Sequence, residues 1–202
     1  MDALETTGRL SNSLIMFMSD NGISWGEHKW TNKMLPYNED IRIPMMMVGK
    51  NLNQPLPAGS DPCPPMYAFT TSCDARIVLN VDVLPTLEGI AGISSGHPVE
   101  GLDMLGGATR PDFVLEHWNN YNPPTYCGVR STDWMYVRYN KYEEPVKEGL
   151  YDETADPFEM NNLAVTDPGD PTVAAELQTM RDRAATLCQV DAGIYPDDWP
   201  YQ

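Results

Sequence analysis

A short polar segment, directly after an apolar run, carries residue types that could bind an ion or an anion. Residues 18–33 read "MSDNGISWGEHKWTNK". Asp20 and Asn21 offer a carboxylate and a side-chain carbonyl, the hard oxygen donors that Ca²⁺ and Mg²⁺ prefer, and Gly22 lets the backbone turn away. "DNG" is also common turn chemistry, so this triplet by itself favours an ordinary turn over a metal site.

A lysine and a histidine follow within the same segment. Lys33 lies thirteen positions after Asp20, and an ammonium group close to a divalent cation makes sense when a tetrahedral dianion sits between them. Taken alone, Lys33 is more typical of a solvated surface lysine. His28 could donate a hydrogen bond to a substrate, although an isolated His is more often structural or exposed. Glu27 has the same ambiguity, with helix capping as its other role.

The elements that would position this segment have an α/β pattern. Continuous apolar runs over 11–19 and 42–49 predict strands buried on both faces. A helix is predicted over 80–92, where Asp82 caps the start and Gly92 ends it. Its predicted apolar face consists of Val83, Leu84, Leu87, Ile90 and Ala91.

The second half of the chain has a different pattern. Short aromatic and β-branched runs, separated by Asn, Pro and Gly, predict an antiparallel meander. Asp170 then starts a helix predicted over 171–188. Two domains are therefore expected: the end of an α/β domain over 1–108, and a small antiparallel sheet packed on the C-terminal helix over 109–202. The inward face of that helix is predicted to be Val173, Leu177, Met180, Ala184 and Leu187.

Composition excludes several classes of partner. Asp and Glu (29) far outnumber Lys and Arg (13), which gives a formal net charge of −16. Nucleic acid needs a basic footprint, so neither nucleic acid nor an anionic membrane surface is an expected partner. The four cysteines lack C-x-x-C spacing, which gives little support to a cysteine zinc site. Two disulfides and buried thiols both remain open, with Cys127 and Cys188 as one pairing.

The opening residues are expected to form the end of an amphipathic helix that stops at Gly8. They have neither the cationic start nor the apolar stretch of a signal peptide. A start partway through a helix, with only two predicted strands in the α/β part, leads us to expect a fragment. The compartment is not determined, and both cytoplasmic and periplasmic or secreted locations fit; the oligomeric state is equally open.

The order and spacing of these motifs resemble the sulfatase family of sulfuric ester hydrolases, within the alkaline phosphatase superfamily. "SDNGISWGEHKWTNK" is similar to the family's S-D-N-G-x-x-x-G-E-H-x-x-x-x-K segment, and "YNEDIRIP" to its Y-E-E-x-x-R-I-P segment. "VDVLPTLEGIAGI", "PVEGLDML" and "GLYDETADPFEMNNLA" resemble later family segments in the family's order. The resemblance covers nearly the whole chain and indicates the C-terminal part of a sulfatase.

The resemblance implies roles for the opening segment. Asp20 and Asn21 would be ligands of a Ca²⁺ ion, with Mg²⁺ as the alternative, and Lys33 would bind the sulfate. His28 matches a family position near the pocket, as a substrate contact. The expected substrate is a small-molecule or saccharide sulfate ester. Its binding is expected to involve the loop 52–73 and the segment 118–126, where Trp118 and Tyr121 could face a sugar or simply pack.

One part of the family pattern is missing. The family's nucleophile is a formylglycine made from the Cys or Ser of a C-x-P-S/A-R motif, and none of the four cysteines here lies in such a motif. We therefore expect no sulfatase turnover by the chain alone. Two alternatives stay open: a related metal-dependent phosphate or phosphonate ester hydrolase, and a non-catalytic pseudo-enzyme or assembly module.

Overall fold

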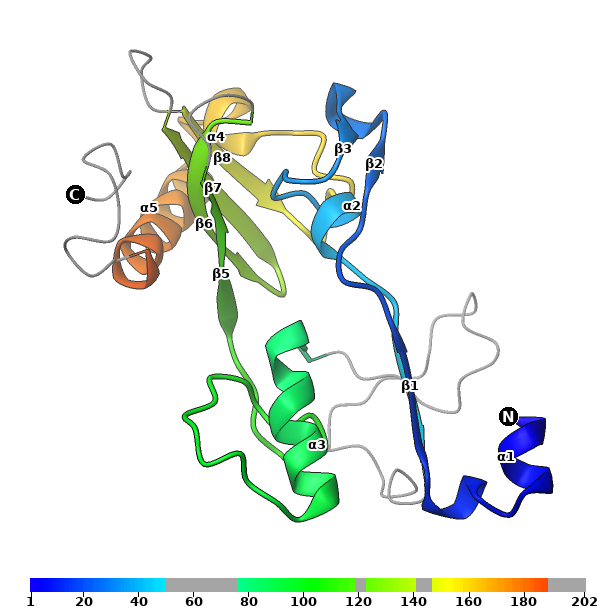
Figure 1. The fold of residues 1–202 in the computed structure, drawn as a ribbon. Coiled ribbons are helices and arrows are strands. Elements are labelled where there is room, and N and C mark those ends of the chain that lie inside the picture. The colour runs from blue at the N-terminus through cyan, green and yellow to red at the C-terminus, as the bar shows by residue number, and fades with distance from the viewer. Residues whose placement is uncertain (50–75, 119–122, 141–146, 189–202) are drawn as a thin grey trace. The chain divides into compact units, whose positions relative to one another are not determined.

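A computed structural model describes residues 1–49, 76–118, 123–140 and 147–188 (Figure 1). These residues form two compact units, which are described separately. Unit 1 comprises Met1–Asp20 and Ile43–Arg110, and unit 2 comprises Asn21–Arg42 and Pro111–Gln202. The loop predicted over 52–73, Tyr121 and the tail after residue 188 lie outside the described residues.

Unit 1 contains two strands and short helical segments. Its elements are α1 (Asp2–Thr6), a 3₁₀ turn (Leu10–Asn12), β1 (Leu14–Met18), β4 (Met45–Gly49), a second 3₁₀ turn (Asn80–Asp82) and α3 (Val83–Ala91). The expected helix stop near Gly8 is confirmed, because α1 ends at Thr6 and Gly8 has a φ of 70°. A positive φ is the conformation that glycine adopts at little cost.

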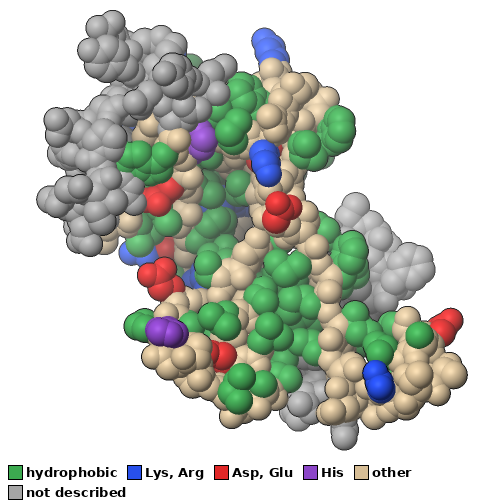
Figure 2. Space-filling view, in the orientation of Figure 1, with side chains coloured by type: hydrophobic (Ala, Val, Ile, Leu, Met, Phe, Trp, Pro, Cys, Tyr) green, Lys and Arg blue, Asp and Glu red, His purple; other side chains and the backbone are tan. Residues whose placement is uncertain are grey.

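The two apolar runs form strands, as predicted, but the prediction that both are buried on both faces was wrong. β1 and β4 pair antiparallel, with Leu14 opposite Gly49. Phe17 is 60% exposed and Met46 is 45% exposed. Figure 2 shows hydrophobic side chains gathered at the surface in the β1 region. In the described part of the chain this sheet has two strands only, so the described elements leave one apolar face uncovered.

Helix α3 lies where it was predicted, but it buries a different face. Gly92 ends it in the left-handed conformation, as expected. Leu84 is 50% exposed and Leu87 is 41% exposed, whereas Asp82 and Thr86 are almost fully buried. Asp82 and Thr86 are buried because they hydrogen-bond the loop that follows the helix. The periodicity of apolar residues cannot indicate such a polar face.

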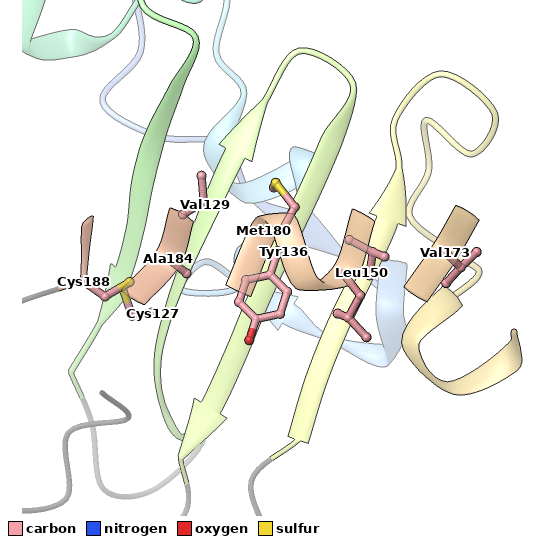
Figure 3. Packing of buried hydrophobic residues seen from close by; sticks show 9 residues of the cluster. Cys127, Val129, Tyr136, Leu150, Val173, Met180, Ala184 and Cys188 are labelled. Atoms are coloured by element: carbon pink, nitrogen blue, oxygen red, sulfur yellow. A yellow bond between two sulfur atoms is a disulfide. The ribbon is translucent and has the colours of Figure 1, made fainter. Parts of the chain in front are cut away.

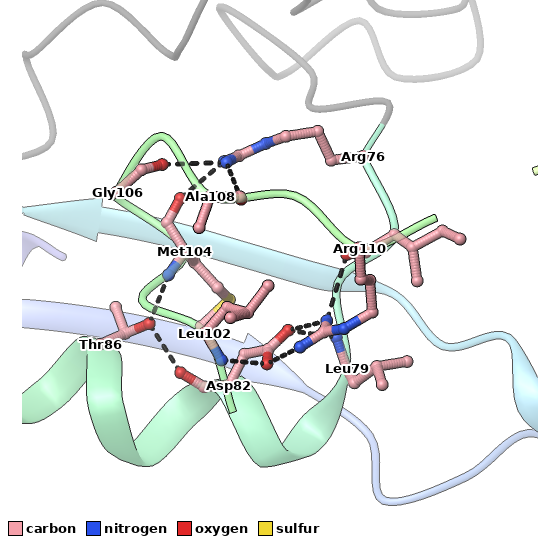
Figure 4. A network of polar contacts seen from close by, with 10 residues as sticks. Arg76, Leu79, Asp82, Thr86, Leu102, Met104, Gly106, Ala108 and Arg110 are labelled. Atoms are coloured by element: carbon pink, nitrogen blue, oxygen red, sulfur yellow. Dashed lines mark hydrogen bonds and ion pairs between the residues drawn. The ribbon is translucent and has the colours of Figure 1, made fainter. Parts of the chain in front are cut away.

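A polar network holds α3 to the segment that follows it (Figure 4). Asp82 accepts hydrogen bonds from the backbone of Leu79 and Leu102, each at 2.8 Å, and a bidentate ion pair from Arg110 at 2.5 Å. Thr86 bridges the helix to Met104 by accepting the Met104 N–H at 2.8 Å. Asp82 directly precedes α3, but its carboxylate makes no capping hydrogen bond to that helix and bonds Leu79, Leu102 and Arg110 instead, so the predicted side-chain cap was wrong.

Unit 2 contains the meander and the C-terminal helix, both as predicted. Its elements are β2 (Ser24–Trp25), a 3₁₀ turn (Glu27–Lys29), β3 (Thr31–Asn32), α2 (Asn38–Ile41), β5 (Asp112–His117), β6 (Thr125–Ser131), β7 (Trp134–Asn140), β8 (Lys147–Asp152), α4 (Leu163–Thr166) and α5 (Pro171–Leu187). Strands β5 to β8 form an antiparallel sheet in sequence order. The hydrophobic side chains of the strands alternate between its two faces, as the period of two requires.

Each face of this sheet has its own core. One face packs on α5 (Figure 3), through Cys127, Val129, Tyr136 and Leu150 from the strands and Val173, Leu177, Met180 and Ala184 from the helix. The opposite face buries Leu115, Tyr126, Met135, Val137 and Tyr151, and Tyr37 and Ile41 pack against it. The sequence predicted only the helix cover; the second cover comes from Asn21–Arg42, about a hundred residues earlier in the chain.

Helix α5 is capped and cross-linked. The Asp170 carboxylate accepts the backbone N–H groups of Thr172 at 2.8 Å and Val173 at 3.1 Å, which confirms the predicted start. Cys188, just after the helix, forms a disulfide with Cys127 of β6. This is the pairing that the sequence left open.

The predicted domain division between residues 108 and 109 stays a prediction, although the compact units change at a nearby point, between Arg110 and Pro111. Among the described helices, none has the length and hydropathy needed to cross a bilayer.

Candidate functional site

The first predicted metal ligand, Asp20, lies two residues after the end of strand β1. Asp20 is the last residue of this part of unit 1, and its side chain is exposed. Ser19 Oγ donates to Asp20 Oδ1 at 3.4 Å, and the Asp20 carbonyl accepts a hydrogen bond from Asn80 Nδ2 at 3.0 Å. The backbone at the end of β1 is therefore tied to the segment that starts α3.

The next two predicted site residues lie together in unit 2. Lys33 Nζ donates to Asn21 Oδ1 at 2.8 Å, and Asn21 Nδ2 donates to the Gly22 carbonyl at 2.7 Å. The proposed sulfate-binding ammonium and the proposed metal-binding carbonyl are thus direct neighbours. A carbonyl oxygen has two lone pairs, so one hydrogen bond from Lys33 is compatible with ligation of a metal by the same atom.

Helix α2 fixes the turn after Asn21. The Gly22 N–H donates to the Asp40 carbonyl at 2.8 Å, and a Cβ at Gly22 would lie 2.0 Å from the Glu39 carbonyl oxygen. Asp40 is 4% exposed and accepts hydrogen bonds from Ser24 Oγ at 2.6 Å and the Leu35 N–H at 2.7 Å. The role of Gly22 is therefore close approach of two backbones, and not only the turn that the sequence suggested.

The donor chemistry here agrees in kind with a Ca²⁺ ion. A carboxylate from Asp20 and an amide oxygen from Asn21 are hard oxygen ligands. Ca²⁺ takes about six to eight oxygens, so these two residues would supply only part of its shell.

His28, the remaining predicted site residue, makes other contacts. Its ring stacks on Tyr37 with the ring centroids 3.7 Å apart, and its Nε2 lies 3.6 Å from Glu39 Oε2. A φ of 51° at His28 turns the backbone locally within the 3₁₀ segment. In the described part of the chain His28 thus belongs to a histidine–carboxylate cluster, while its role as a substrate contact stays a prediction.

The sequence reasoning missed the carboxylates around His28. Glu39 and Glu159 each place one potential ligand atom within 4.8 Å of the other and of His28. Burial raises the pKa of Glu159 to about 9; the Asn38 N–H opposes this shift and the Glu153 carboxylate adds to it. Both residues lie inside motifs that the sequence displays, "YNEDIRIP" and "DPFEMNNLA". The available signal was an acidic residue within each motif, but their proximity was not visible.

The comparisons with known proteins agree with the motifs. The sequence model of the sulfatase family matches residues 1–93. The chain is 31% identical to the choline-sulfatase of Rhizobium meliloti (strain 1021) over an alignment of 201 residues. That alignment covers 95% of this chain and 35% of that protein. It is 29% identical over 175 residues to the N-acetylglucosamine-6-O-sulfatase of Bacteroides thetaiotaomicron, covering 81% of this chain and 28% of that protein.

The fold of the chain also matches those of solved structures. A solved structure of a protein in complex with its substrate, D-glucosamine-2-N,6-O-disulfate, matches with a TM-score of 0.67 at 24% identity, covering 90% of this chain and 36% of that chain. The chain spans about a third of the length of the curated relatives it matches. Family model, relatives, fold and the ordered motifs all agree: this chain belongs to the sulfatase family.

Proposed function

We propose that this chain is the C-terminal part of an enzyme that hydrolyses sulfate esters of small molecules or saccharides. The observation that carries the proposal is the 2.8 Å hydrogen bond between Lys33 Nζ and Asn21 Oδ1. It places a positive charge next to an oxygen that can ligate a cation, and an ammonium together with a metal ion can hold a tetrahedral dianion. The matched relatives are named as sulfatases, which supports the same reaction class.

Each residue has a defined part in this proposal. Lys33 binds a sulfate oxygen and holds the ester in place. Asp20 and Asn21 contribute oxygen ligands to a Ca²⁺ ion, with Mg²⁺ as the alternative, which when bound would neutralise charge on the sulfate. Asp40 supports the site indirectly, because it holds the turn that carries Asn21.

In this proposal the nucleophile comes from residues outside this chain. None of its four cysteines lies in a C-x-P-S/A-R motif, the source of the family's formylglycine. We therefore expect the isolated chain to have no turnover of an aryl sulfate. Measurable hydrolysis by the purified chain that is abolished by Lys33→Ala would contradict this expectation.

The main test uses the complete protein that contains this chain, with an aryl sulfate as substrate. Lys33→Ala should lower kcat/KM by about 10²- to 10³-fold, the loss typical when one charge-stabilising donor is removed. Lys29→Ala is the matched control, since Lys29 is an exposed lysine of the same segment. Equal activity of the two variants would remove Lys33 from the site.

A substrate panel separates this function from its alternatives. We expect sulfate esters, including choline sulfate and glucosamine 6-sulfate, to be cleaved faster than the matching phosphate and phosphonate esters. The Asn21 amide favours sulfate, since the resemblance to phosphohydrolases would more often place His there. A preference for phosphate would identify the alternative hydrolase, and inactivity of the complete protein towards every ester would favour a non-catalytic module.

Calcium binding can be measured on the chain itself. Isothermal titration should detect Ca²⁺ binding that weakens when Asp20 and Asn21 are replaced by Ala, because both lost groups are oxygen ligands. Glu100→Gln, an exposed carboxylate elsewhere in unit 1, is the control. Unchanged affinity in the double variant would exclude these two residues as ligands.

A further inference from the structure

Three potential metal ligands meet within unit 2, apart from Asn21 and Lys33. The donor atoms of His28, Glu39 and Glu159 all lie within 4.8 Å of one another. His28 Nε2 and Glu39 Oε2 are 3.6 Å apart, close to the roughly 3.4 Å between two ligands of a tetrahedral ion with bonds of about 2.1 Å. One pair of the cluster therefore has nearly the spacing of two ligands of a small cation, and the ligand atom of Glu159 lies within 4.8 Å of both.

Each residue of this cluster has one buried polar atom without a hydrogen-bond partner in the described part of the chain. His28 Nε2, Glu39 Oε2 and Glu159 Oε1 are buried and have no hydrogen-bond partner among the described residues, and the first two lie 3.6 Å apart. Glu159 is only 1% exposed. Leaving a buried carboxylate oxygen unpaired is costly, and a single cation between the three atoms would satisfy all of them.

The charged side chains around the cluster also favour binding of a cation. The Glu153 side chain, 4% exposed, adds a third carboxylate, and its partner Arg130 lies 2.8 Å away. Three carboxyl groups are therefore gathered near one guanidinium, which is itself paired with Glu153. A divalent cation would offset the charge of the carboxylates that ligate it.

Supporting contacts orient the ligands. The Asn38 N–H donates to Glu159 Oε2 at 2.8 Å, which leaves Oε1 as the unpaired oxygen, and the stacked Tyr37 ring fixes the His28 imidazole. Such partners are typical of metal sites. The His28 and Glu39 side chains are 10% and 21% exposed, so the cluster has a route to solvent.

We infer that His28, Glu39 and Glu159 form a binding site for a divalent transition-metal cation of the Zn²⁺ class. One imidazole nitrogen with two carboxylates suits Zn²⁺, whereas Ca²⁺ takes six to eight oxygens. The site shares no residue with the proposed Ca²⁺ ligands Asp20 and Asn21. Its predicted role is structural: it joins the 27–39 segment to the loop that carries Glu159.

The test measures Zn²⁺ binding by the purified chain after removal of metals with a chelator. We expect about one equivalent of Zn²⁺ to bind and to raise Tm by several degrees. His28→Ala, Glu159→Gln and Glu39→Gln should each weaken Zn²⁺ binding at least about tenfold. Glu39 is the most exposed of the three ligands, so Glu39→Gln is the variant least liable to disturb folding, and circular dichroism checks all of them.

Matched controls and Co²⁺ make the outcomes decisive. His97→Ala and Glu100→Gln replace an exposed histidine and an exposed glutamate in unit 1 and should bind Zn²⁺ like the wild type. Co²⁺ bound in place of Zn²⁺ should give a visible absorption band that Glu39→Gln removes. Equal Zn²⁺ affinity of wild type and Glu39→Gln, or no binding by the wild type, would overturn the inference, since protons would then neutralise the cluster.

Discussion

At the scale of single residues, Gly22 has the least freedom in the segment that carries Asn21. A Cβ there would lie 2.0 Å from the Glu39 carbonyl oxygen. We expect Gly22→Ala to destabilise unit 2 by about 1–3 kcal/mol, as overpacking does, measured by urea unfolding followed by tryptophan fluorescence. Gly169→Ala is the control, since nothing lies within 4 Å of its added Cβ. Equal midpoints for both variants would contradict this packing.

Asp82 gives a pH dependence at the same scale. Burial raises the pKa of its carboxyl, but the hydrogen bonds from Arg110, Leu79 and Leu102 outweigh this effect and hold the pKa below its ordinary value. A lowered pKa in the folded state means that the contribution of Asp82 is fully present above the unfolded-state pKa, about 3.9. It is lost as the pH falls through the folded-state pKa.

Asp82→Asn tests this contribution. We expect a loss of about 1.5–3 kcal/mol for unit 1 at pH 7, the range for a hydrogen bond to a charged group. The loss should shrink as the pH falls below about 4, where the carboxyl is protonated in the unfolded chain, and should disappear once the pH passes the lower folded-state pKa. Urea unfolding from pH 7 to pH 3 measures both, with Glu100→Gln as the control; a loss that is constant with pH would assign the effect to packing.

At the scale of elements, the disulfide connects α5 to the sheet that it covers. Cys127 and Cys188 are fully buried and 61 residues apart in sequence. Replacing both by Ser should lower the free energy of unfolding of unit 2 by about 2–5 kcal/mol, mainly because the unfolded chain is less constrained. Dithiothreitol should destabilise the wild type by a similar amount and leave the double variant unchanged; destabilisation of both would point to another cause.

The elements that could be predicted are those with a signal in consecutive residues of the sequence. The meander and α5 were predictable because alternation, the Asp170 cap and the helical spacing of Val173, Leu177 and Met180 are written in consecutive residues. The buried face of α3 was not, because Asp82 and Thr86 are buried by bonds to a loop some twenty residues later. Hydrogen bonds between residues far apart in the sequence leave no periodic pattern in that sequence.

At the scale of the whole molecule, the hydrophobic core is unequally divided. Of the buried hydrophobic residues described, Met104 lies in unit 1, and all the others lie in unit 2. Since burial of apolar surface is the main stabilising contribution, we expect unit 1 to unfold at a lower urea concentration than unit 2. Hydrogen exchange should show faster amide exchange in β1, β4 and α3 than in β6 and β7; one concerted transition would contradict this order.

The sequence by itself determined the family and the α/β and meander elements, and it supplied the prediction that Asp20, Asn21 and Lys33 bind an ion and a sulfate. Those features depend on local order and spacing, which a single chain displays directly. Only the tertiary structure showed that Lys33 contacts Asn21 and that His28 lies beside Glu39 and Glu159. Residues more than a hundred positions apart become neighbours through packing of α2 against the sheet, and no pattern in neighbouring residues encodes that contact.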